Sequence, residues 1–227
     1  MSKLDDLIAE LCPNGVEYKT IESVCSLSAG GDVPKERLSN EKTDKFSIPI
    51  FSNGIGENAL YGWTDISKID KPCITVAARG TIGYCALREK PFFPVVRLIC
   101  AIPNDSLNVR FLKYVIEILQ IHVPTSGIPQ LTVPMLGKYK IPVPPLPVQF
   151  EIVRILDDFT LRTAELIAEL TTELTARKKQ YEYYRNLLLT FDNVEAIISQ
   201  TDRQTDRQTL PHYKGDVLQL FYRHPSL

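Results

Sequence analysis

A long stretch of helical periodicity, residues 148–191, constrains this chain more than any other feature. Apolar residues recur along it in steps of three and four, with one double four-step through its middle, and no Gly or Pro interrupts it. This pattern predicts a long amphipathic helix with a coiled-coil seam, in which the double four-step is a stutter that locally unwinds the supercoil. Such a helix is about 65 Å long at 1.5 Å per residue. A domain of the size that precedes it needs no helix of that length to close its core.

The apolar stripe of this helix is the predicted dimerisation surface. Its members are Ile152, Leu156, Phe159, Leu166, Leu170, Leu174, Tyr181, Tyr184 and Leu188, followed by Phe191. Thr163 and Arg177 fill two further positions of the seam. A lone helix of this kind leaves its stripe exposed to water, so a partner helix is physically required.

The residues before the helix are predicted to form one α+β domain, residues 1–147. Residues 3–11 have helical spacing with Ser2 as the N-cap, and residues 16–28 read as a strand followed by a short helical turn. Later segments are rich in strand-forming residues, with one more helix at 111–119. The predicted extended segments are residues 46–51, 60–63, 73–77, 81–87, 95–102, 131–136 and 139–143. Strands dominate, with a few helices on one side, which is typical of the α+β class.

A proline-rich run at 141–147 separates this domain from the helix. Four prolines hold the chain extended, so the helix is predicted to begin at Val148 with Pro147 in its first turn. The chain therefore divides into residues 1–147, the dimerisation and spacer helix 148–191, and a tail of residues 192–227.

The tail contains the tetrapeptide Thr-Asp-Arg-Gln repeated at 201–208, and Thr209 begins a third copy. Low-complexity polar sequence of this kind does not build a core. The genetic code allows the tetrapeptide to be written as three ACAG units, so gain or loss of a unit would shift the reading frame. Residues 210–227 would then be one of three possible endings, which is a form of phase variation. The alternative is an ordinary repeated linker, and sequencing the codons distinguishes the two.

Composition bounds the compartment and the partners. Five widely spaced cysteines without a CxxC pair indicate reduced, buried thiols in a cytoplasmic protein. No apolar run has the length of a membrane span, and the acidic start does not resemble a signal peptide. The net charge is −1, but residues 1–32 carry two basic and six acidic residues, whereas residues 71–140 carry nine basic and three acidic ones. A segregated positive region suits phosphate binding, and charges scattered around the surface are the alternative.

The sequence shows no catalytic constellation. Its three histidines are far apart without metal-ligand spacing, and Gly-Thr-Ile-Gly at 80–83 lacks the pattern of a phosphate-binding loop. We expect no catalytic residue, no metal site and no cofactor bound by this chain.

One motif identifies a family. The run Gly-Ile-Pro-Gln-Leu-Thr-Val-Pro-Met-Leu-Gly-Lys-Tyr-Lys-Ile-Pro-Val-Pro-Pro-Leu-Pro-Val-Gln-Phe-Glu-Ile-Val-Arg-Ile-Leu-Asp-Asp-Phe, residues 127–159, closely resembles the DNA-specificity subunits of Type I restriction-modification enzymes. In that family a target-recognition domain ends in such a signature, which then opens a long helix. Two weaker similarities lie at residues 12–21 and 78–83, and the resemblance covers residues 1–191.

The resemblance implies a non-catalytic, DNA-binding subunit. Family members usually hold two recognition domains and two long helices that run antiparallel, whereas this chain has one of each. It therefore looks like a half-length subunit that needs a second copy, or another half-subunit, to form an antiparallel coiled coil. The implied target is double-stranded DNA with a split inverted repeat. The implied protein partners are a modification methyltransferase subunit and a restriction subunit, which would bind S-adenosylmethionine, ATP and Mg²⁺.

Base reading requires polar and basic side chains on exposed loops. The candidate DNA-binding residues are Arg79, Thr81, Lys90, Ser126, Gly127, Gln130, Lys35, Arg37, Lys42 and Lys45. Gly80 and Gly83 are assigned to the turn itself, and Tyr61 and Trp63 to the core.

Two other readings stay open at this point. One is a coiled-coil interaction or scaffold protein whose domain binds another protein, and which would be indifferent to DNA. The other is a truncated product of a frame-shifted gene, which could neither dimerise nor join a methyltransferase.

Overall fold

The computed structural model describes residues 2–123 and 127–189. The chain divides into two compact units, residues 1–160, here called the head, and residues 161–227. The helical elements are α1 (Lys3–Leu11), α2 (Ile21–Val24), η1 (Lys35–Arg37), η2 (Gly56–Ala59), α3 (Val109–Ile118), α4 (Val133–Gly137) and α5 (Leu146–Leu189). The strands are β1 (Tyr18–Thr20), β2 (Cys25–Ala29), β3 (Ile48–Phe51), β4 (Leu60–Thr64), β5 (Cys73–Ala77), β6 (Cys85–Arg88), β7 (Phe93–Pro94), β8 (Leu98–Pro103) and β9 (Lys140–Pro142).

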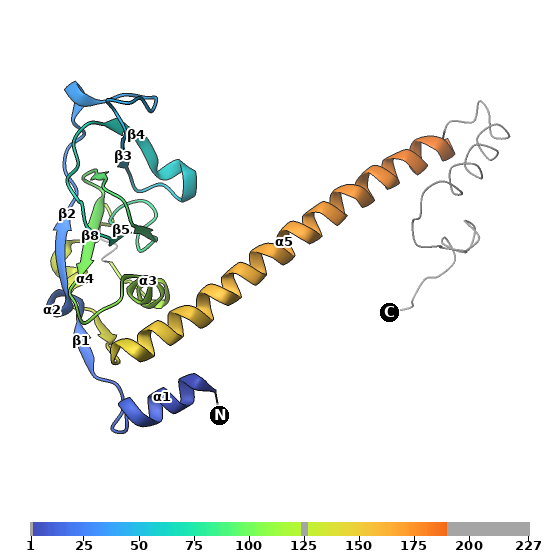
Figure 1. The fold of residues 1–227 in the computed structure, drawn as a ribbon. Helices are drawn as coiled ribbons and strands as arrows, with labels where there is room; N and C mark the ends of the chain where they lie inside the picture. Colours follow the sequence, from blue (N-terminus) through green and yellow to red (C-terminus); the bar gives the residue numbers. More distant parts are fainter. Residues whose placement is uncertain (1, 124–126, 190–227) are drawn as a thin grey trace. The chain divides into compact units, whose positions relative to one another are not determined.

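An antiparallel four-stranded sheet in the order β2-β8-β5-β6 forms the centre of the head (Figure 1). Thr75 of β5 lies opposite Cys100 of β8, and Leu27 of β2 lies opposite Ala101. All residues of β5 are buried, because both faces of this strand are covered. The continuous apolar run of β5 is the pattern expected of a strand without a solvent face.

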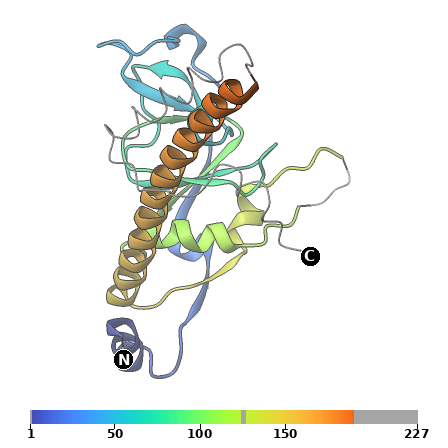
Figure 2. The ribbon, with the colours of Figure 1, turned by 90° about the vertical axis from the view of Figure 1, so that its right-hand side faces the viewer.

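The two faces of this sheet belong to different parts of the core. Ile74 and Val76 of β5 pack in the main apolar cluster with residues of α3, which lies beside the sheet in both ribbon views (Figures 1 and 2). α3 contributes a buried stripe at helical spacing, Phe111, Leu112, Val115 and Ile116. Cys73 points to the opposite face, where it packs with Phe92 and Cys100. The alternation follows from the two-residue period of a strand.

Two smaller sheets complete the head. β3 pairs antiparallel with β4 and parallel with β7. β1 pairs antiparallel with β9, with Lys19 opposite Ile141. This second pairing joins the start of the chain to the segment that leads into α5.

The beginning of α5 is fixed to the head by Gln149, whose side chain is fully buried. Its Oε1 accepts a hydrogen bond from the Asn108 N–H at 2.8 Å, and its Nε2 donates to the carbonyl oxygens of Ser106 at 2.9 Å and Pro144 at 2.7 Å. Val153, one turn further, is buried in the main cluster. Since a buried amide is tolerated only when its polar atoms are paired, these three bonds position the helix at its origin.

The N-terminal helix α1 contacts α5 through a buried carboxylate. Ser2 caps α1, accepting a bond from the Asp5 N–H while the Asp5 carboxylate accepts one from the Ser2 N–H. Lys3 of α1 lies 3.0 Å from Glu151 of α5, whose side chain is only 3% exposed. Arg154 also donates to this carboxylate, and the hydrogen bonds from Arg154 and then Lys3 lower the pKa of Glu151 to about 2.

This ion pair makes the stability of the head depend on pH. The folded-state pKa of Glu151 is lowered from 4.5 to about 2, so its contribution is present above pH 4.5 and is lost as the pH falls toward 2. We expect Glu151→Gln to lower the midpoint of urea unfolding at neutral pH, with the difference from the native chain shrinking on acidification. The exposed Glu182 of the same helix is the matched control, because Glu182→Gln should produce no such pH-dependent difference. A difference for Glu151→Gln that stays constant from neutral to acid pH would contradict this assignment.

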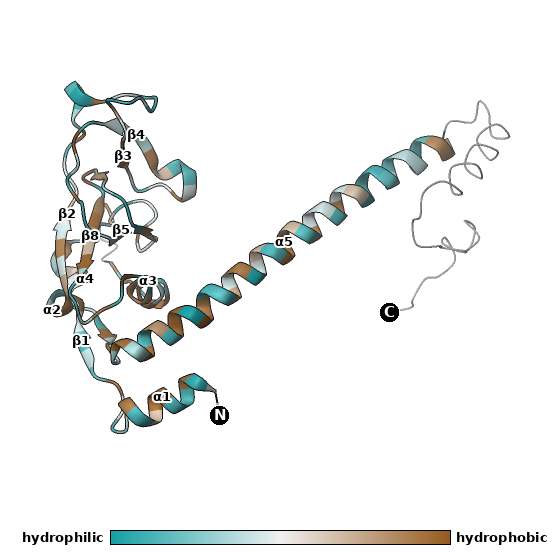
Figure 3. Cartoon of the chain, in the orientation of Figure 1, coloured by the Kyte–Doolittle hydropathy of each residue, from teal (hydrophilic) through white to brown (hydrophobic). Residues whose placement is uncertain are grey.

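The part of α5 beyond the head exposes its apolar side chains. Between Leu161 and Leu189 every described residue is exposed or half-buried, and Leu170, for example, is 63% exposed. Apolar and polar residues alternate along the helix (Figure 3). None of the helices in the described ranges is long and apolar enough to cross a membrane.

The predicted α+β class with a long helix after the sheet domain is confirmed, and the coiled-coil pairing of that helix stays a prediction. The helix begins at Leu146 rather than Val148, since proline is tolerated in the first turn. The extended structure predicted for residues 131–136 is wrong. α4 forms there because the Thr132 hydroxyl caps the Met135 N–H and Pro134 suits the first turn. Phe191 and the whole tail lie outside the described residues.

Candidate nucleic-acid interface

Asn53 joins two loops of the head that are far apart in sequence. Its Nδ2 donates to the Arg79 carbonyl at 2.8 Å, and its own carbonyl accepts the Thr81 hydroxyl at 2.6 Å. The Ser52 hydroxyl donates to Asn53 Oδ1 at 3.1 Å. The loop after β3 is thereby fastened to the turn between β5 and β6.

A third segment joins the same surface. The Arg79 guanidinium donates a short hydrogen bond to Gln130 Oε1, and the Leu131 N–H donates to the Ala78 carbonyl at 2.9 Å. The structure therefore brings together three of the predicted readers, Arg79, Thr81 and Gln130, in one cluster. We call these three residues and Asn53 the loop cluster.

The turn between β5 and β6 needs glycine for its conformation. Gly80 has φ +72° and Gly83 has φ +86°, in the left-handed region that side chains with a Cβ rarely adopt. The assignment of these glycines to the turn is confirmed. In this turn Arg79 is exposed and Thr81 is half-buried.

A half-buried arginine supports the loop that carries Asn53. The Arg88 guanidinium at the end of β6 lies 3.6 Å from the centre of the Phe51 ring at the end of β3. Its burial lowers the pKa of Arg88. Stacking of the planar guanidinium on the ring ties the ends of the two strands together, just before Ser52 and Asn53.

An open hollow of about 820 Å³ adjoins the loop cluster through Ser52. Its lining comes from residues 31–37, from Ser52 and Tyr61, and from residues 95–97. The backbone is closely packed at its edge, where a Cβ on Gly30 would lie 1.9 Å from the Val95 carbonyl oxygen. The Arg97 carbonyl accepts the Ala78 N–H at 2.9 Å, which sets the hollow beside Arg79.

Basic side chains line the hollow, and they differ in whether an acidic side chain pairs with them. Arg37 donates to Asp65 at 2.9 Å, and this hydrogen bond holds the pKa of Asp65 below its usual value. Lys35 and Arg97 are exposed in the lining. The charge of Arg37 is matched by Asp65, and Asp32 and Glu36 line the hollow together with Lys35 and Arg97, so the hollow carries charges of both signs.

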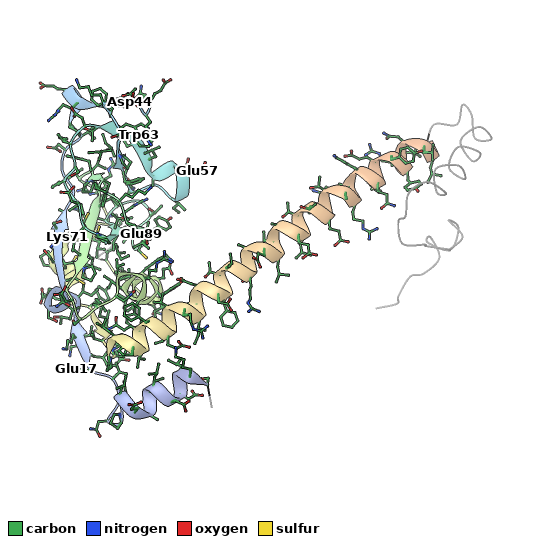
Figure 4. All side chains as sticks on the ribbon, viewed as in Figure 1. Glu17, Asp44, Glu57, Trp63, Lys71 and Glu89 are labelled. Carbon is green, nitrogen blue, oxygen red and sulfur yellow. The ribbon has the colours of Figure 1, made fainter. Side chains whose placement is uncertain are left out.

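The other predicted readers lie elsewhere on the head. Lys42 lies over the Trp63 ring at 5.4 Å and Lys45 over the Phe46 ring at 5.3 Å, in the part of the head built around β3 and β4, where Trp63 and Asp44 are labelled in Figure 4. Lys90 lies exposed at the bend after β6. Gly127 is exposed with φ +91°. Ser126 lies outside the described residues.

The structure changes the predicted set of surface and core residues at two aromatic and two polar positions. The placement of Tyr61 in the core is wrong, since it is 53% exposed and lines the hollow. Trp63 is half-buried beneath Lys42. Asn53 and Arg97 were not among the predicted readers. The Asn-Gly dipeptide at 53–54 was the available signal for Asn53, and nothing in the local sequence distinguishes Arg97.

This surface offers amide, hydroxyl and guanidinium groups. Arg, Asn and Gln are the residues that form paired hydrogen bonds with base edges. Within the described ranges, no group of three or more His, Cys, Asp or Glu residues could hold a metal ion, and the five cysteines are free and buried, as predicted. Fold and surface together define a recognition module joined to a long helix.

The chain belongs to the family of Type I restriction modification DNA specificity domains, whose family model matches residues 13–176. The resemblance seen in the motif at 127–159 is therefore confirmed. The matched region covers most of the head and much of α5.

Named relatives agree with this assignment. A putative type I specificity subunit of Mycoplasma pneumoniae is 34% identical over 171 residues, which are 75% of this chain and 51% of the relative. The specificity subunit of the Escherichia coli enzyme EcoR124I/EcoR124II is 35% identical over 204 residues, covering 80% of this chain and 50% of the relative. The chain thus spans about half the length of these curated relatives.

Solved structures share the fold. The specificity subunit of a type I restriction-modification system from M. genitalium has a TM-score of 0.54 at 23% identity, covering 82% of this chain and 49% of that one. A chain from a structure on the assembly of a type I restriction-modification system has a TM-score of 0.60 at 21% identity, covering 75% and 44%. A sheet domain followed by a long helix is the shared architecture.

Proposed function

We propose that this chain is a DNA-recognition subunit of a Type I restriction-modification complex, acting through one recognition domain and one long helix. Two copies, or this chain and another half-subunit, pair through α5 and read a split inverted-repeat sequence in double-stranded DNA. The chain carries no catalytic residue. Bound partner subunits supply methyl transfer and cleavage, and they bind S-adenosylmethionine, ATP and Mg²⁺.

The observation that carries this proposal is the loop cluster on the head of a family member. Arg79 and Gln130 come from segments that are far apart in sequence, yet their side chains bond to each other on the surface. Asn53 holds the chain just after Arg79, because its side-chain amide donates to the Arg79 carbonyl and its main-chain carbonyl accepts from the Thr81 hydroxyl. A guanidinium and an amide held on a braced turn are suited to the paired donor and acceptor pattern of a base edge.

The exposed seam of α5 supports the pairing. Its apolar residues from Phe159 to Leu188 are exposed in the single chain, and together they make a contiguous stripe of the kind that marks an interface between proteins. Leaving the stripe in water forgoes about 25 cal/mol per Å² of apolar surface. A second helix of the same kind covers it.

The pairing also sets the form of the target. In an antiparallel pair, the two heads are attached at opposite ends of the coiled coil, and each reads one half-site. A helix of about 65 Å spans about 19 base pairs at 3.4 Å each, which is an upper limit to the separation of the half-sites. The two-fold relation between the heads makes the half-sites an inverted repeat.

Replacing Arg79 with alanine tests the reading surface. The dimer loses one base contact in each of its two half-sites, and a good base contact is worth about 1–3 kcal/mol, so we expect affinity for the cognate site to fall by at least about thirtyfold. The preference for one particular base pair at one position of each half-site should become weaker. The measurement is a mobility-shift titration with the cognate duplex and with duplexes varied at single positions. The cognate sequence comes from mapping methylated sites in cells that carry this gene and its methyltransferase partner.

Lys178→Ala is the matched control, since it removes the same unit of charge from an exposed residue of α5. It should leave base preference unchanged. Arg79→Ala with native affinity and native base preference would remove Arg79 from the reading surface. If the native protein shows no salt-sensitive retention on DNA or heparin but captures a protein through its head, the scaffold reading replaces this proposal.

A further inference from the structure

The seam of α5 has the same spacing in both directions. Its eleven positions, nine apolar residues with Thr163 and Arg177, are arranged around Leu170. Counted from Leu170, the positions lie in equidistant pairs at four, seven, eleven, fourteen and eighteen residues. These pairs are Leu166 and Leu174, Thr163 and Arg177, Phe159 and Tyr181, Leu156 and Tyr184, and Ile152 and Leu188.

This symmetry distinguishes the two ways in which identical helices can pair. In a parallel pair each seam residue meets its own copy, so any spacing keeps the layers aligned. In an antiparallel pair, a residue meets the one that lies equally far on the other side of the two-fold axis. All layers then align only if the spacing is the same in both directions. The observed spacing meets this stricter condition at all eleven positions from Ile152 to Leu188.

The polar members of the seam favour the same direction. A parallel pair would place Arg177 against its own copy, so two guanidinium groups would face each other between the helices, each with only Glu173 of its own helix at 3.5 Å as an ion-pair partner. An antiparallel pair places Arg177 beside the partner's Thr163, whose hydroxyl is a hydrogen-bond acceptor. Tyr181 then meets the partner's Phe159, which forms an aromatic layer on each side of the axis.

The charges along α5 provide an independent argument. Leaving out Glu151 and Arg154, which pair with each other at the head, the helix carries four acidic residues and one basic residue from Ile155 to Glu169, whereas from Thr171 to Leu189 it carries two acidic and four basic ones. Antiparallel pairing sets the acidic half of one copy against the basic half of the other. Parallel pairing places the acidic halves of the two copies together and the basic halves together, and the repulsion between like charges costs free energy at low salt.

We infer that α5 pairs with a second copy of itself in one antiparallel register, with the two-fold axis at Leu170. The inference rests on the proposed function and specifies the partner surface of that dimer. In this register Leu170 meets its own copy, and each of the other seam residues meets its equidistant counterpart. The face of α5 that carries Leu161 stays outside the seam, because nine residues at 3.6 per turn place it half a turn from Leu170.

This register fixes the distance between the two heads' points of attachment. Ile152 packs against the core of the head and lies eighteen residues from Leu170. The two copies of Ile152 would therefore lie about 54 Å apart along the paired helices, or about 16 base pairs of B-form DNA. This separation of the two attachment points is shorter than the upper limit set by the full length of the helix.

Introduced cysteines test the register. The five native cysteines are buried in the head and should not react on brief oxidation of the folded full-length chain. Leu170→Cys should give a disulfide-linked dimer in non-reducing electrophoresis. Thr163→Cys alone and Arg177→Cys alone should give none, because each residue lies about 21 Å along the axis from its own copy, beyond the reach of a disulfide, about 7 Å between Cα atoms. The double variant Thr163→Cys/Arg177→Cys should link efficiently.

Leu161→Cys is the matched control for an exposed leucine off the seam, and it should not link. Links from Thr163→Cys alone would show a parallel pair and overturn the inference. A dimer in which Leu170→Cys fails to link would place the axis elsewhere and also overturn it. Size-exclusion chromatography of the native chain distinguishes these results from a failure of the proposed function. A monomeric native chain would exclude the dimer itself. A dimer with a different pattern of disulfide links would exclude only the proposed register.

Discussion

Leu170→Lys is expected to convert the dimer into a monomer. At the proposed axis the substitution removes two leucines from one layer and places two ammonium groups against each other. Losing a buried leucine side chain costs about 2–5 kcal/mol, so two of them weaken dimerisation by at least about a thousandfold at 1.4 kcal/mol per tenfold. Sedimentation equilibrium of the full-length chain across a concentration series measures the change. Binding to a duplex with both half-sites should fall to the level seen with a single half-site.

Leu161→Lys is the matched control, because it introduces the same charge at an exposed leucine on the other side of the helix. It should leave the dissociation constant of the dimer near its native value. The head should remain folded in both variants, since α5 is exposed at both positions. A dimer that persists unchanged in Leu170→Lys would exclude this seam as the pairing surface.

Gln149→Leu is expected to produce the largest loss of stability in the head. The side chain fits the same space, but three backbone groups lose their partners: the Asn108 N–H and the carbonyl oxygens of Ser106 and Pro144. Each buried polar group left unpaired costs about 1–3 kcal/mol. We therefore expect the free energy of unfolding to fall by about 3 kcal/mol or more in urea denaturation, a large share of the roughly 5–15 kcal/mol that stabilises an ordinary domain.

The same substitution at Gln180, an exposed residue of α5, should leave the unfolding midpoint of the head unchanged. Gln149→Glu should be intermediate, since a carboxylate can still accept from Asn108 but cannot donate to either carbonyl. If Gln149→Leu unfolds at the native urea concentration, the three hydrogen bonds do not fix the origin of α5.

The long helix and the main strands could be predicted from the sequence because their periodicity extends over many residues. The seam repeats through ten turns or more of α5, so a few irregular positions do not obscure it. By contrast, residues 131–136 form a short apolar run in which strand and helix patterns cannot be told apart. There a single hydroxyl, that of Thr132, and a proline decide in favour of α4. Local capping outweighs composition in so short an element.

The candidate site could be predicted only in part for a related reason. Arg79, Thr81 and Gln130 were recognisable as polar residues in loops. Their proximity, however, depends on how the loop after β3, the turn between β5 and β6, and the segment before α4 pack together. Asn53 bonds across 26 residues to Arg79 and across 28 to Thr81, and no local pattern encodes such a partnership. Tyr61 reads as a core aromatic by type, yet β4 lies beside an open hollow that exposes it.

The way Gln149 holds α5 bears on how such chains diversify. All three hydrogen bonds of the Gln149 side chain go to main-chain atoms. These bonds therefore depend on the position of the backbone at residues 106, 108 and 144 and not on the side chains there. A head with other loops and another preferred sequence, provided that it keeps this backbone and the side chains that pair with Glu151 and Asp157 of α5, could be joined to the same helix by genetic exchange near residue 145. New specificities could then arise without any change in the surface on which the two copies meet.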